Sequence, residues 1–319
     1  MSVLVTGAAG FIGSHLSEAL LSQGREVVGL DNFNDGYARA TKERNLQSAL
    51  DCERFRLVEG DIRDEAVLRT LPEVTAVIHL AARAGVRPSI ERPTLYMDVN
   101  VMGTARLLRF VRERAIGSFV FASSSSVYGN NRTVRFTETD RVDTPISPYA
   151  ATKKAGELLC HTSTHLDGIA SICLRFFTAH GPRQRPDLAI HKFARLLARG
   201  EAIPMFGDGS TSRDYTYVGD VVEGVARALK WAEGNPGSYE IVNLGGGRTI
   251  DLARMIELLG EAMGVVPRIQ RLPTQPGDVD RTYADVAKAR SLLGYDPKVE
   301  FEEGLRRFVN WLQGQPEAL

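Results

Sequence analysis

The stretch SVLVTGAAGFIGSHL, residues 2–16, joins a short apolar run to three glycines at three-residue spacing and then to an apolar pattern of helical period. It predicts a strand, a tight turn and a helix. Gly7 would let the chain leave the strand tightly, Gly10 would let a pyrophosphate approach the backbone, and Gly13 would let the helix pack close to the sheet. Because the start of the helix then faces the anion, the stretch predicts a dinucleotide-binding site.

Asp31 comes at the end of a second strand, predicted over residues 26–30. A carboxylate at this place suits a ribose diol and repels a 2′-phosphate, so the two signals together favour NAD over NADP. Glycine-rich turns are common in α/β proteins, and an ordinary turn followed by a loop aspartate is the alternative interpretation.

Asp61 follows another predicted strand, residues 55–58. Its carboxylate could accept a hydrogen bond from an adenine amino group. It could equally cap the helix predicted from Asp64 to Leu71, because Asp is a favoured N-cap residue. The sequence leaves both interpretations open.

Length and composition limit the class of protein. The chain has 319 residues, with 39 Lys+Arg and 39 Asp+Glu, so it can bury a large core and carries no net charge. Zero net charge argues against nucleic acid or an anionic membrane as a partner bound through bulk electrostatics. No apolar run approaches the roughly 20 residues of a membrane span, and Met1 leads directly into the first strand, so we expect a cytoplasmic protein. Cys52, Cys160 and Cys173 lack CxxC spacing, so we expect reduced thiols and no bound metal.

Predicted strands and helices alternate in the first half of the chain, which is typical of a parallel sheet covered on both faces. The predicted fold class is therefore α/β, with a doubly wound parallel sheet. The strand over residues 74–80 ends at Ala81 and Ala82, where ligands of such sheets bind and where small side chains leave room for a cofactor. His79 lies within that strand, so we interpret it as a core histidine.

Residues 83–89 follow as a predicted loop with two guanidinium groups. These groups are either solvated or aimed at a phosphate or carboxylate. The helical pattern over residues 95–114 includes Asn100, a polar side chain that could face the sheet and order a catalytic group.

Two further segments carry side chains suited to acid–base chemistry. A strand predicted over residues 118–122 runs into the serines 123–126, which form either a low-complexity turn or, as we prefer, a substrate site at the strand's carboxyl end. Tyr149 and Lys153 lie four residues apart on a helix that begins after Pro148, and hence on one face. A free Tyr titrates near ~10, so a neighbouring ammonium group that favours the phenolate would make Tyr149 a usable base.

These motifs together resemble those of the extended short-chain dehydrogenase/reductases, specifically the nucleotide-sugar epimerase branch, over nearly the whole chain. The resemblance implies tightly held NAD, a homodimer built on the helices around 95–115 and 149–166, and contact of Ser124 and Tyr149 with the sugar 4-hydroxyl. The catalytic residues are then Tyr149, Lys153 and Ser124. The expected cofactor-binding residues are Gly7, Gly10, Phe11, Ile12, Gly13, Asp31, Asn32, Asp61, Ile62, Leu80, Ala81, Ala82, Asn100, Tyr149 and Lys153.

The same resemblance implies substrate contacts in the second half of the chain. Arg213 would meet the diphosphate with its guanidinium fork, unless it forms an ion pair with Asp214 or Asp208. Relatives often have Arg at the place of Gln275, so Arg281 or Arg87 would substitute for it, and Asp278 would bind the uridine ribose. The expected substrate-binding residues are Arg87, Ser124, Ser125, Ser126, Tyr149, Thr178, Arg185, Arg213 and Asp278.

The resemblance is strongest to branch members that epimerise UDP-glucuronate at C4. Relatives that dehydrate or decarboxylate their sugar carry carboxylic acids where this chain has Ser125 and Ser126, and hydroxyls do not easily replace such acids near pH 7. Thr178 and the serines offer hydroxyls, and Arg185 offers a fork, to a C6 carboxylate. For Arg185 the alternative is a surface position in a basic loop.

Other functions stay open at this stage. UDP-glucose/UDP-galactose 4-epimerase is the main alternative and UDP-glucuronate decarboxylase a weaker one. A redox sensor or scaffold could keep the same fold, although it would not need the phenolate base. We expect an NAD-binding domain from residues 1–177 and about 215–245, and a smaller mixed α/β UDP-sugar-binding domain from about 178–214 and 246–319.

Overall fold

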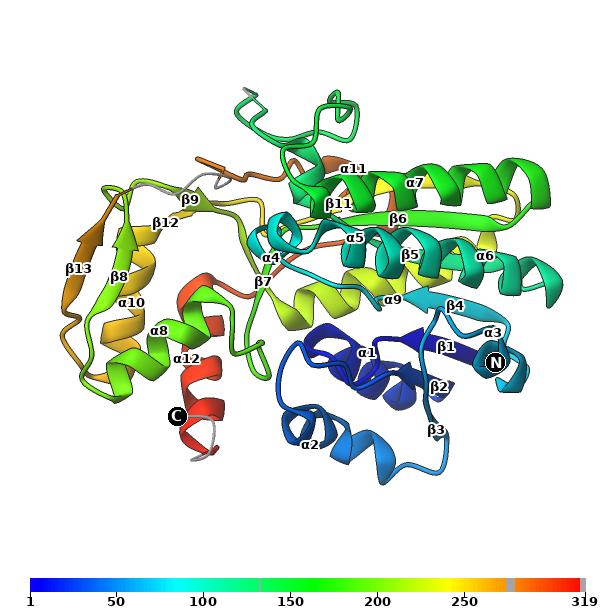
Figure 1. Cartoon of the computed structure of the whole chain (residues 1–319), viewed down its shortest axis with the longest axis horizontal. Coiled ribbons are helices and arrows are strands. Elements are labelled where there is room, and N and C mark those ends of the chain that lie inside the picture. Colours follow the sequence, from blue (N-terminus) through cyan, green and yellow to red (C-terminus); the bar gives the residue numbers. More distant parts are fainter. Residues whose placement is uncertain (132, 274–278, 316–319) are drawn as a thin grey trace.

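Seven parallel strands form the centre of the larger lobe (Figure 1). In the order in which they lie side by side, they are β11 (Tyr239–Leu244), β6 (Ala170–Phe176), β5 (Ser118–Ser124), β4 (Ala76–His79), β1 (Ser2–Thr6), β2 (Glu26–Asp31) and β3 (Phe55–Glu59). Each neighbouring pair is parallel. The computed structural model describes residues 1–131, 133–273 and 279–315.

The direction of the chain reverses at β1, which lies between β2 and β4. The chain goes from β1 to β2 and β3 on one side and returns to β4, β5, β6 and β11 on the other. In doubly wound sheets such a reversal leaves a crevice outside the carboxyl ends of the strands, where ligands bind. The topology therefore predicts the site at the ends of β1 and β4.

Helices cover both faces of the sheet. One core contains side chains of α1 (Phe11–Ser22), α2 (Arg39–Leu50), α9 (Val218–Gly234) and α11 (Ala287–Leu293). The other contains side chains of α3 (Glu65–Thr70), α6 (Gly103–Glu113) and α7 (Pro148–Asp167). The remaining helical segments on the way to α6 are α4 (Val86–Glu91), α5 (Pro93–Tyr96) and the π-helical turn η1 (Met97–Met102). The predicted α/β fold class with a doubly wound parallel sheet is confirmed.

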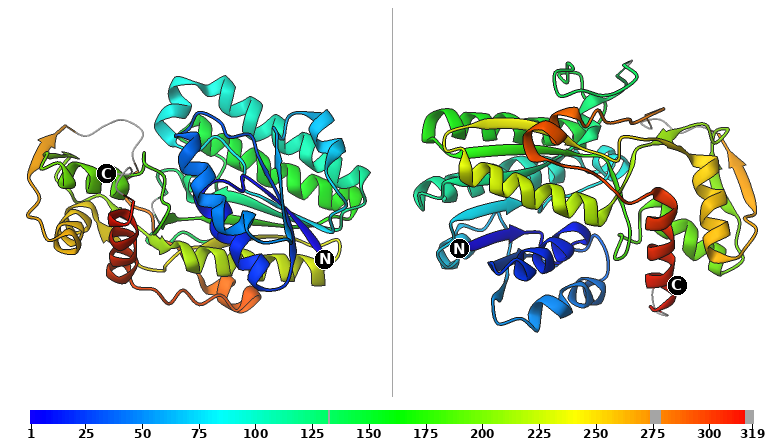
Figure 2. Two further views of the ribbon diagram at one scale, coloured as in Figure 1. Left: turned by 90° about the horizontal axis from the view of Figure 1, so that it is seen from below. Right: turned by 180° about the vertical axis from the view of Figure 1, so that it is seen from behind.

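A smaller lobe lies at the end of the molecule away from the N-terminus (Figure 2). Its core joins α8 (Ala189–Ala198), α10 (Leu252–Met263) and α12 (Phe301–Gln313) to β8 (Ile203–Phe206). The strand β13 (Ile269–Leu272) pairs with β8 in parallel. Two more pairs are β7 (Thr178–His180) with β10 (Tyr215–Tyr217), which are parallel, and β9 (Ser212–Arg213) with β12 (Ile250–Asp251), which are antiparallel.

The domain division stays a prediction, but one segment assigned to the UDP-sugar-binding domain packs on the large sheet. Residues 284–295 were assigned to the second domain, but Ala284, Val286, Ala289, Leu293 and Tyr295 belong to the core of the large sheet. The reason is that α11 packs on α9 and β11.

Two helices were not predicted from the sequence. The segment 83–89 was predicted to be a loop, but α4 begins at Val86. In α2, Lys42 and Asn45 are buried beside Leu46 and Ala49, so half of the buried face is polar and gives no apolar period. Among the described residues, no helix is long and apolar enough to cross a membrane.

Candidate active site

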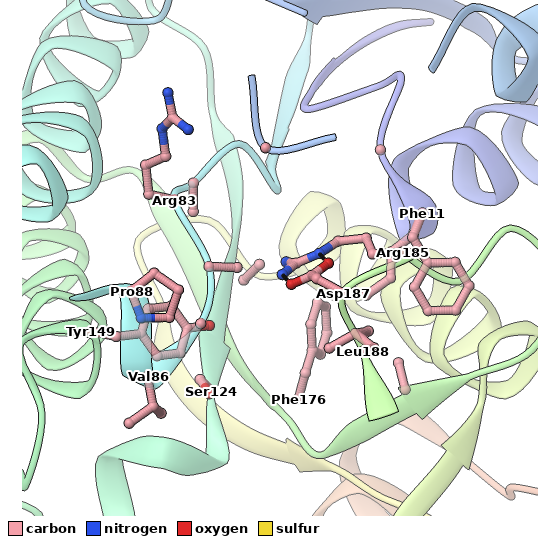
Figure 3. Close-up of a pocket in the computed structure, with 18 of the residues that line it drawn as sticks. Phe11, Arg83, Val86, Pro88, Ser124, Tyr149, Phe176, Arg185, Asp187 and Leu188 are labelled. Carbon is pink, nitrogen blue, oxygen red and sulfur yellow. Dashed lines mark hydrogen bonds and ion pairs between the residues drawn. The ribbon is translucent and has the colours of Figure 1, made fainter. Parts of the chain in front are cut away.

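A cavity of about 1140 Å³ lies between the carboxyl ends of the large sheet and the smaller lobe. It begins at the glycine turn, passes β5 and α7, and reaches β8 and β9. Figure 3 shows Tyr149 and Ser124 on one side of it and Arg185, Asp187 and Phe11 on the other. The cavity thus brings together residues from both halves of the chain.

The glycine turn has the geometry that the sequence predicted. Gly7 has a φ of 73°, and a Cβ atom on Gly13 would lie 2.1 Å from the Gly7 carbonyl oxygen. Gly10 occupies the N-cap of α1, and no side chain caps this helix. The first backbone N–H groups of α1 therefore suit an anion such as a pyrophosphate.

Asp31 is buried at the end of β2 and lines the cavity. Its Oδ1 accepts from the Phe33 N–H (2.8 Å), and its Oδ2 accepts from the Ala9 N–H (3.1 Å). The Lys42 Nζ lies 3.7 Å from Asp31 Oδ1, and burial lowers the pKa of this ammonium group. Lys42 also lines the cavity, but sequence reasoning missed it because α2 itself was not predicted.

Asp61 is not the cap of α3. The N-cap residue is Asp64, whose Oδ1 accepts from the Ala66 N–H (2.8 Å). Asp61 lines the cavity with Ile62, and its Oδ2 accepts from Asn32 Nδ2 (2.7 Å). Hydrogen bonds from the Arg63 guanidinium lower the pKa of Asp61 to about 2, so its carboxylate is ionised at neutral pH. The adenine contact stays a prediction.

Leu80, Ala81 and Ala82 line the cavity as expected, but Asn100 does not. Asn100 lies in η1, where its Oδ1 accepts from the Arg83 N–H (2.8 Å) and its Nδ2 donates to Thr152 Oγ1 (3.0 Å). It therefore supports the cavity wall from behind, next to Lys153. His79 is a satisfied core residue, as predicted: its ring nitrogens lie 2.7 Å from Thr6 Oγ1 and 2.9 Å from Thr104 Oγ1.

Ser124 ends β5, and Tyr149 and Lys153 follow from the first turns of α7. The helix starts here because Ser147 accepts from the Ala150 N–H (3.1 Å) and Pro148 takes the first helical position. The Ser89 hydroxyl of α4 accepts from the Tyr149 N–H (3.1 Å), which ties the start of α7 to the opposite helix. All three predicted catalytic residues line the cavity.

The electrostatics around Tyr149 differ from the prediction. Burial raises the pKa of its hydroxyl, and the Ser124 hydroxyl and the Arg185 guanidinium oppose that rise. Lys153 was expected to act on the phenol, but its Nζ lies 6.0 Å from the centre of the Tyr149 ring and donates to the Ala122 carbonyl at 2.6 Å. Burial lowers the pKa of Lys153 to about 8. An effect of Arg185, 36 residues further along the chain, on the pKa of Tyr149 was not predicted.

Ser125 and Ser126 also line the cavity, in a short 3₁₀ turn over Ser125–Tyr128. The Ser124 hydroxyl donates to the Ser126 hydroxyl (3.1 Å) and accepts from the Ser126 N–H (3.2 Å). The Ser123 hydroxyl instead donates to the buried Glu157 carboxylate (2.7 Å). The serine run is therefore part of the site and not a solvated turn.

Arg185 forms the opposite side of the cavity, which Thr178 also lines. The Arg185 side chain is 23% exposed, and its Nε and NH2 groups donate to the two oxygens of Asp187 at 3.0 and 2.5 Å. It therefore faces the cavity and is not a fully solvated surface residue. The residue Asp187, which holds it, was not predicted as part of the site.

Arg213 lines the far end of the cavity and donates to the Ser212 carbonyl at 2.9 Å. The ion-pair alternatives are not found: Asp214 accepts from the Gly246, Gly247 and Ala284 N–H groups, and Asp208 accepts from Ser210.

Two arginines were candidates to replace the family arginine at Gln275. Arg87 lines the cavity and lies 5.3 Å from the centre of the Phe206 ring, whereas Arg281 donates to the Thr133 carbonyl (3.3 Å) and does not line it. The geometry therefore favours Arg87. Gln275 and Asp278 lie outside the described residues.

Known proteins share both the sequence and the fold. The profile of the GDP-mannose 4,6 dehydratase family matches residues 4–308. The UDP-glucuronate 4-epimerase of Thermodesulfobacterium geofontis is 43% identical over 99% of this chain and 97% of its own, and UDP-glucuronate 4-epimerase 3 of Arabidopsis thaliana is 43% identical over 98% of this chain and 76% of its own.

Solved structures give the same picture. The Bacillus cereus UDP-glucuronic acid 4-epimerase, in complex with UDP-glucuronic acid and NAD, superposes with a TM-score of 0.93 at 36% identity and covers 98% of this chain and 99% of its own. The dTDP-glucose 4,6-dehydratase DesIV of Streptomyces venezuelae reaches 0.92 at 33% identity, over 99% and 98%. With its glycine turn, its Tyr149–Lys153 helix and these full-length matches, the chain belongs to the nucleotide-sugar epimerase and dehydratase family of extended short-chain dehydrogenases/reductases.

Proposed function

We propose that this protein is an NAD-dependent epimerase that interconverts UDP-glucuronate and UDP-galacturonate through a transient 4-keto sugar. One observation carries the proposal: a single cavity that starts at the glycine turn places the phenol of Tyr149 opposite the guanidinium of Arg185. The first group suits removal of a proton from a sugar hydroxyl, and the second suits a sugar carboxylate. Three of the relatives named above, from Thermodesulfobacterium geofontis, Arabidopsis thaliana and Bacillus cereus, are UDP-glucuronate 4-epimerases.

The cofactor residues fit NAD in their chemistry. Gly7, Gly10 and Gly13 leave the start of α1 open to a pyrophosphate, and the buried Asp31 offers a carboxylate to a ribose diol. Asp61 offers an ionised acceptor to the adenine amino group. When bound, NAD would accept the hydride from C4 and return it to the other face of the 4-keto sugar, so no cofactor is consumed.

Tyr149 and Ser124 contact the sugar 4-hydroxyl in this proposal. Tyr149 takes this proton as phenolate, and Ser124 beside it holds the same hydroxyl by a hydrogen bond. Burial raises the pKa of Tyr149, and the Ser124 hydroxyl and the Arg185 guanidinium oppose this rise. Lys153, with a pKa of about 8, stays mainly charged at pH 7 and holds the cofactor ribose.

Arg185, Thr178, Ser125 and Ser126 surround C6 of the sugar in this proposal. Asp187 uses the Nε and NH2 groups of Arg185, so further N–H donors of the five remain for a substrate carboxylate. Once C4 is a ketone, loss of CO₂ is fastest when the breaking bond stands perpendicular to the carbonyl plane. Donors that hold the carboxylate away from this geometry suppress that loss.

A panel of UDP-sugars, incubated with the purified protein without added NAD, tests the proposal. We expect UDP-galacturonate as the product of UDP-glucuronate. If UDP-glucose is epimerised equally well, the substrate assignment fails and the UDP-glucose 4-epimerase alternative replaces it. A 4-keto-6-deoxy sugar or a UDP-pentose as the main product would refute simple epimerisation. An inert protein that still binds NAD would point to a sensor or scaffold.

We further propose a homodimer in the cytoplasm. Met97 and Met102 of η1 and Leu158 of α7 are 44%, 48% and 57% exposed on helices that pack against each other, which leaves an apolar face suited to a second copy. We expect a dimer by light scattering and a monomer for Leu158→Glu; a monomeric wild type would contradict this. In the domain division that we propose, the larger lobe, now with residues 284–295, binds NAD and the smaller lobe binds UDP.

A further inference from the structure

The segment between β7 and α8, which carries Arg185, is fastened to the helix that follows the glycine turn. The His15 Nε2 of α1 lies 2.9 Å from the Pro182 carbonyl oxygen. Because a carbonyl only accepts, the imidazole must carry its proton on Nε2. Three residues further along α1, the Glu18 carboxylate accepts from the Arg183 NH2 at 2.7 Å. Two contacts from one helix therefore hold two successive residues of the segment.

Arg183 has an unusual backbone conformation. Its φ is 63°, in the left-handed region that L-residues other than Gly, Asn and Asp rarely adopt. Such a conformation persists only when its surroundings hold it in place. A β-turn holds it here: the Gln184 N–H donates to the Gly181 carbonyl (3.2 Å), with Pro182 and Arg183 at the two central positions. The ion pair with Glu18 and the hydrogen bond from His15 to Pro182 fasten this turn to α1.

The conformation of Arg183 decides where Arg185 points. The residue between them, Gln184, is buried: its Nε2 donates to the Ala179 carbonyl (3.2 Å), and its own carbonyl oxygen lies 2.6 Å from His191 Nδ1. The chain then turns outward, and Arg185 extends into the cavity from the same side as Phe11 of α1 (Figure 3). Only Gln184 separates Arg183 from Arg185, so a change in the backbone conformation of Arg183 would shift Arg185.

We propose that Arg183 is a positioning residue: its ion pair with Glu18 fixes the segment so that Arg185 meets the acid group of the sugar. Helix α1, whose first turn would receive the cofactor, thereby also sets the position of the Arg185 guanidinium. This inference rests on the proposed function, because it takes Arg185 as the contact of the uronate carboxylate. Neither Arg183 nor Glu18 touches the cavity in this arrangement.

Kinetics of two single variants test the inference. Glu18→Ala removes the acceptor, and Arg183→Asn removes the guanidinium but keeps a residue that tolerates positive φ. In each we expect the KM for UDP-glucuronate to rise about fivefold or more, because Arg185 no longer meets the carboxylate in the right place. The inhibition constant of UDP, which has no carboxylate to reach Arg185, should stay within about twofold.

Two further variants serve as controls. Glu233→Ala breaks the Arg25–Glu233 ion pair, whose side chains are 21% and 23% exposed. This pair is a matched control, because Arg183 and Glu18 are 18% and 29% exposed. The variant should leave the KM for UDP-glucuronate and the inhibition constant of UDP unchanged. The exchanged pair Glu18→Arg with Arg183→Glu should recover most of the lost affinity for UDP-glucuronate.

The outcomes separate this inference from the proposed function. A wild type that leaves UDP-glucuronate unchanged overturns the proposed function and the inference with it. If the wild type is active but the two variants keep its KM, the inference alone fails. It also fails if affinity for UDP and for UDP-glucuronate falls in parallel, since this would indicate only a general structural role.

Discussion

The two sides of the cavity hold their functional side chains by different means. Tyr149, Lys153 and Ser124 project from α7 and β5, where the backbone hydrogen bonds of a long helix and of a central strand fix them. Arg185 projects from an irregular segment whose position depends on a left-handed residue and on contacts with α1. The first side is rigid through local structure, the second through tertiary contacts.

The two sides also differ in the roles that we propose for them. In the function that we propose, the residues for hydride transfer and proton removal at C4 lie on regular elements. The proposed choice of the sugar rests on the irregular side, where a segment can change without disturbing the sheet. We therefore expect substitutions on the regular side to abolish turnover and substitutions on the irregular side to change selectivity.

The largest effect is expected for Gly13→Ala. The new Cβ would lie 2.1 Å from the Gly7 carbonyl oxygen, a backbone atom that cannot yield without opening the turn. The purified variant should contain no NAD, as judged by the ratio of absorbance at 260 and 280 nm, and should show no activity. Gly117→Ala is the control, because its Cβ would meet nothing within 4 Å. Retention of NAD in Gly13→Ala would show that the turn is not the pyrophosphate site.

Tyr149→Phe should lower turnover by on the order of 10²-fold or more, because it removes the group that takes the proton of the 4-hydroxyl. The control is Tyr96→Phe, a second phenol whose ring centre lies 6.3 Å from that of Tyr149 and whose hydroxyl donates to the Ala84 carbonyl. Loss of this neutral hydrogen bond should cost at most about fivefold. Equal turnover in the two variants would remove Tyr149 from its role.

The regular side is also the one that the sequence predicts best. The spacing of Tyr149 and Lys153 fixes their common face on a helix, and the glycine spacing fixes the turn, since both depend on neighbours in the chain. Lys42 and Asp187 could not be found in this way. Lys42 lies on a helix whose buried face is half polar, and Asp187 acts through its partner Arg185. The influence of Arg185 on Tyr149 spans two lobes and has no local signal.

On the irregular side, Arg185→Ala should lower kcat/KM for UDP-glucuronate by about tenfold or more and that for UDP-glucose much less. The carboxylate would then reach the perpendicular geometry more often, so the fraction of decarboxylated UDP-4-keto-pentose should rise. Thr178→Ala should act in the same direction but less strongly. Arg281→Ala is a suitable control because Arg281 does not line the cavity. Unchanged selectivity and no pentose in the Arg185 and Thr178 variants would refute the carboxylate contact.

Two of the buried histidines, His79 in β4 and His180 in β7, predict the smallest effect, which is on stability. Burial lowers the pKa of His79 and of His180 to about 3, so both are neutral in the folded protein at pH 5. In the unfolded chain a histidine binds a proton below a pKa of about 6.5, so the free energy of unfolding should fall as pH drops from about 6.5 towards 3, by about 1.4 kcal/mol per pH unit for each residue. His79 is hydrogen-bonded on both ring nitrogens, whereas those of His180 have no hydrogen-bond partner among the described residues and its ring packs on Tyr215 and Phe301. His180→Phe should therefore fold. In urea unfolding at pH 6.0, 5.5 and 5.0, its free energy of unfolding should depend less steeply on pH than that of the wild type, by the contribution of one histidine. An equally steep dependence would show that His180 is not the neutral group.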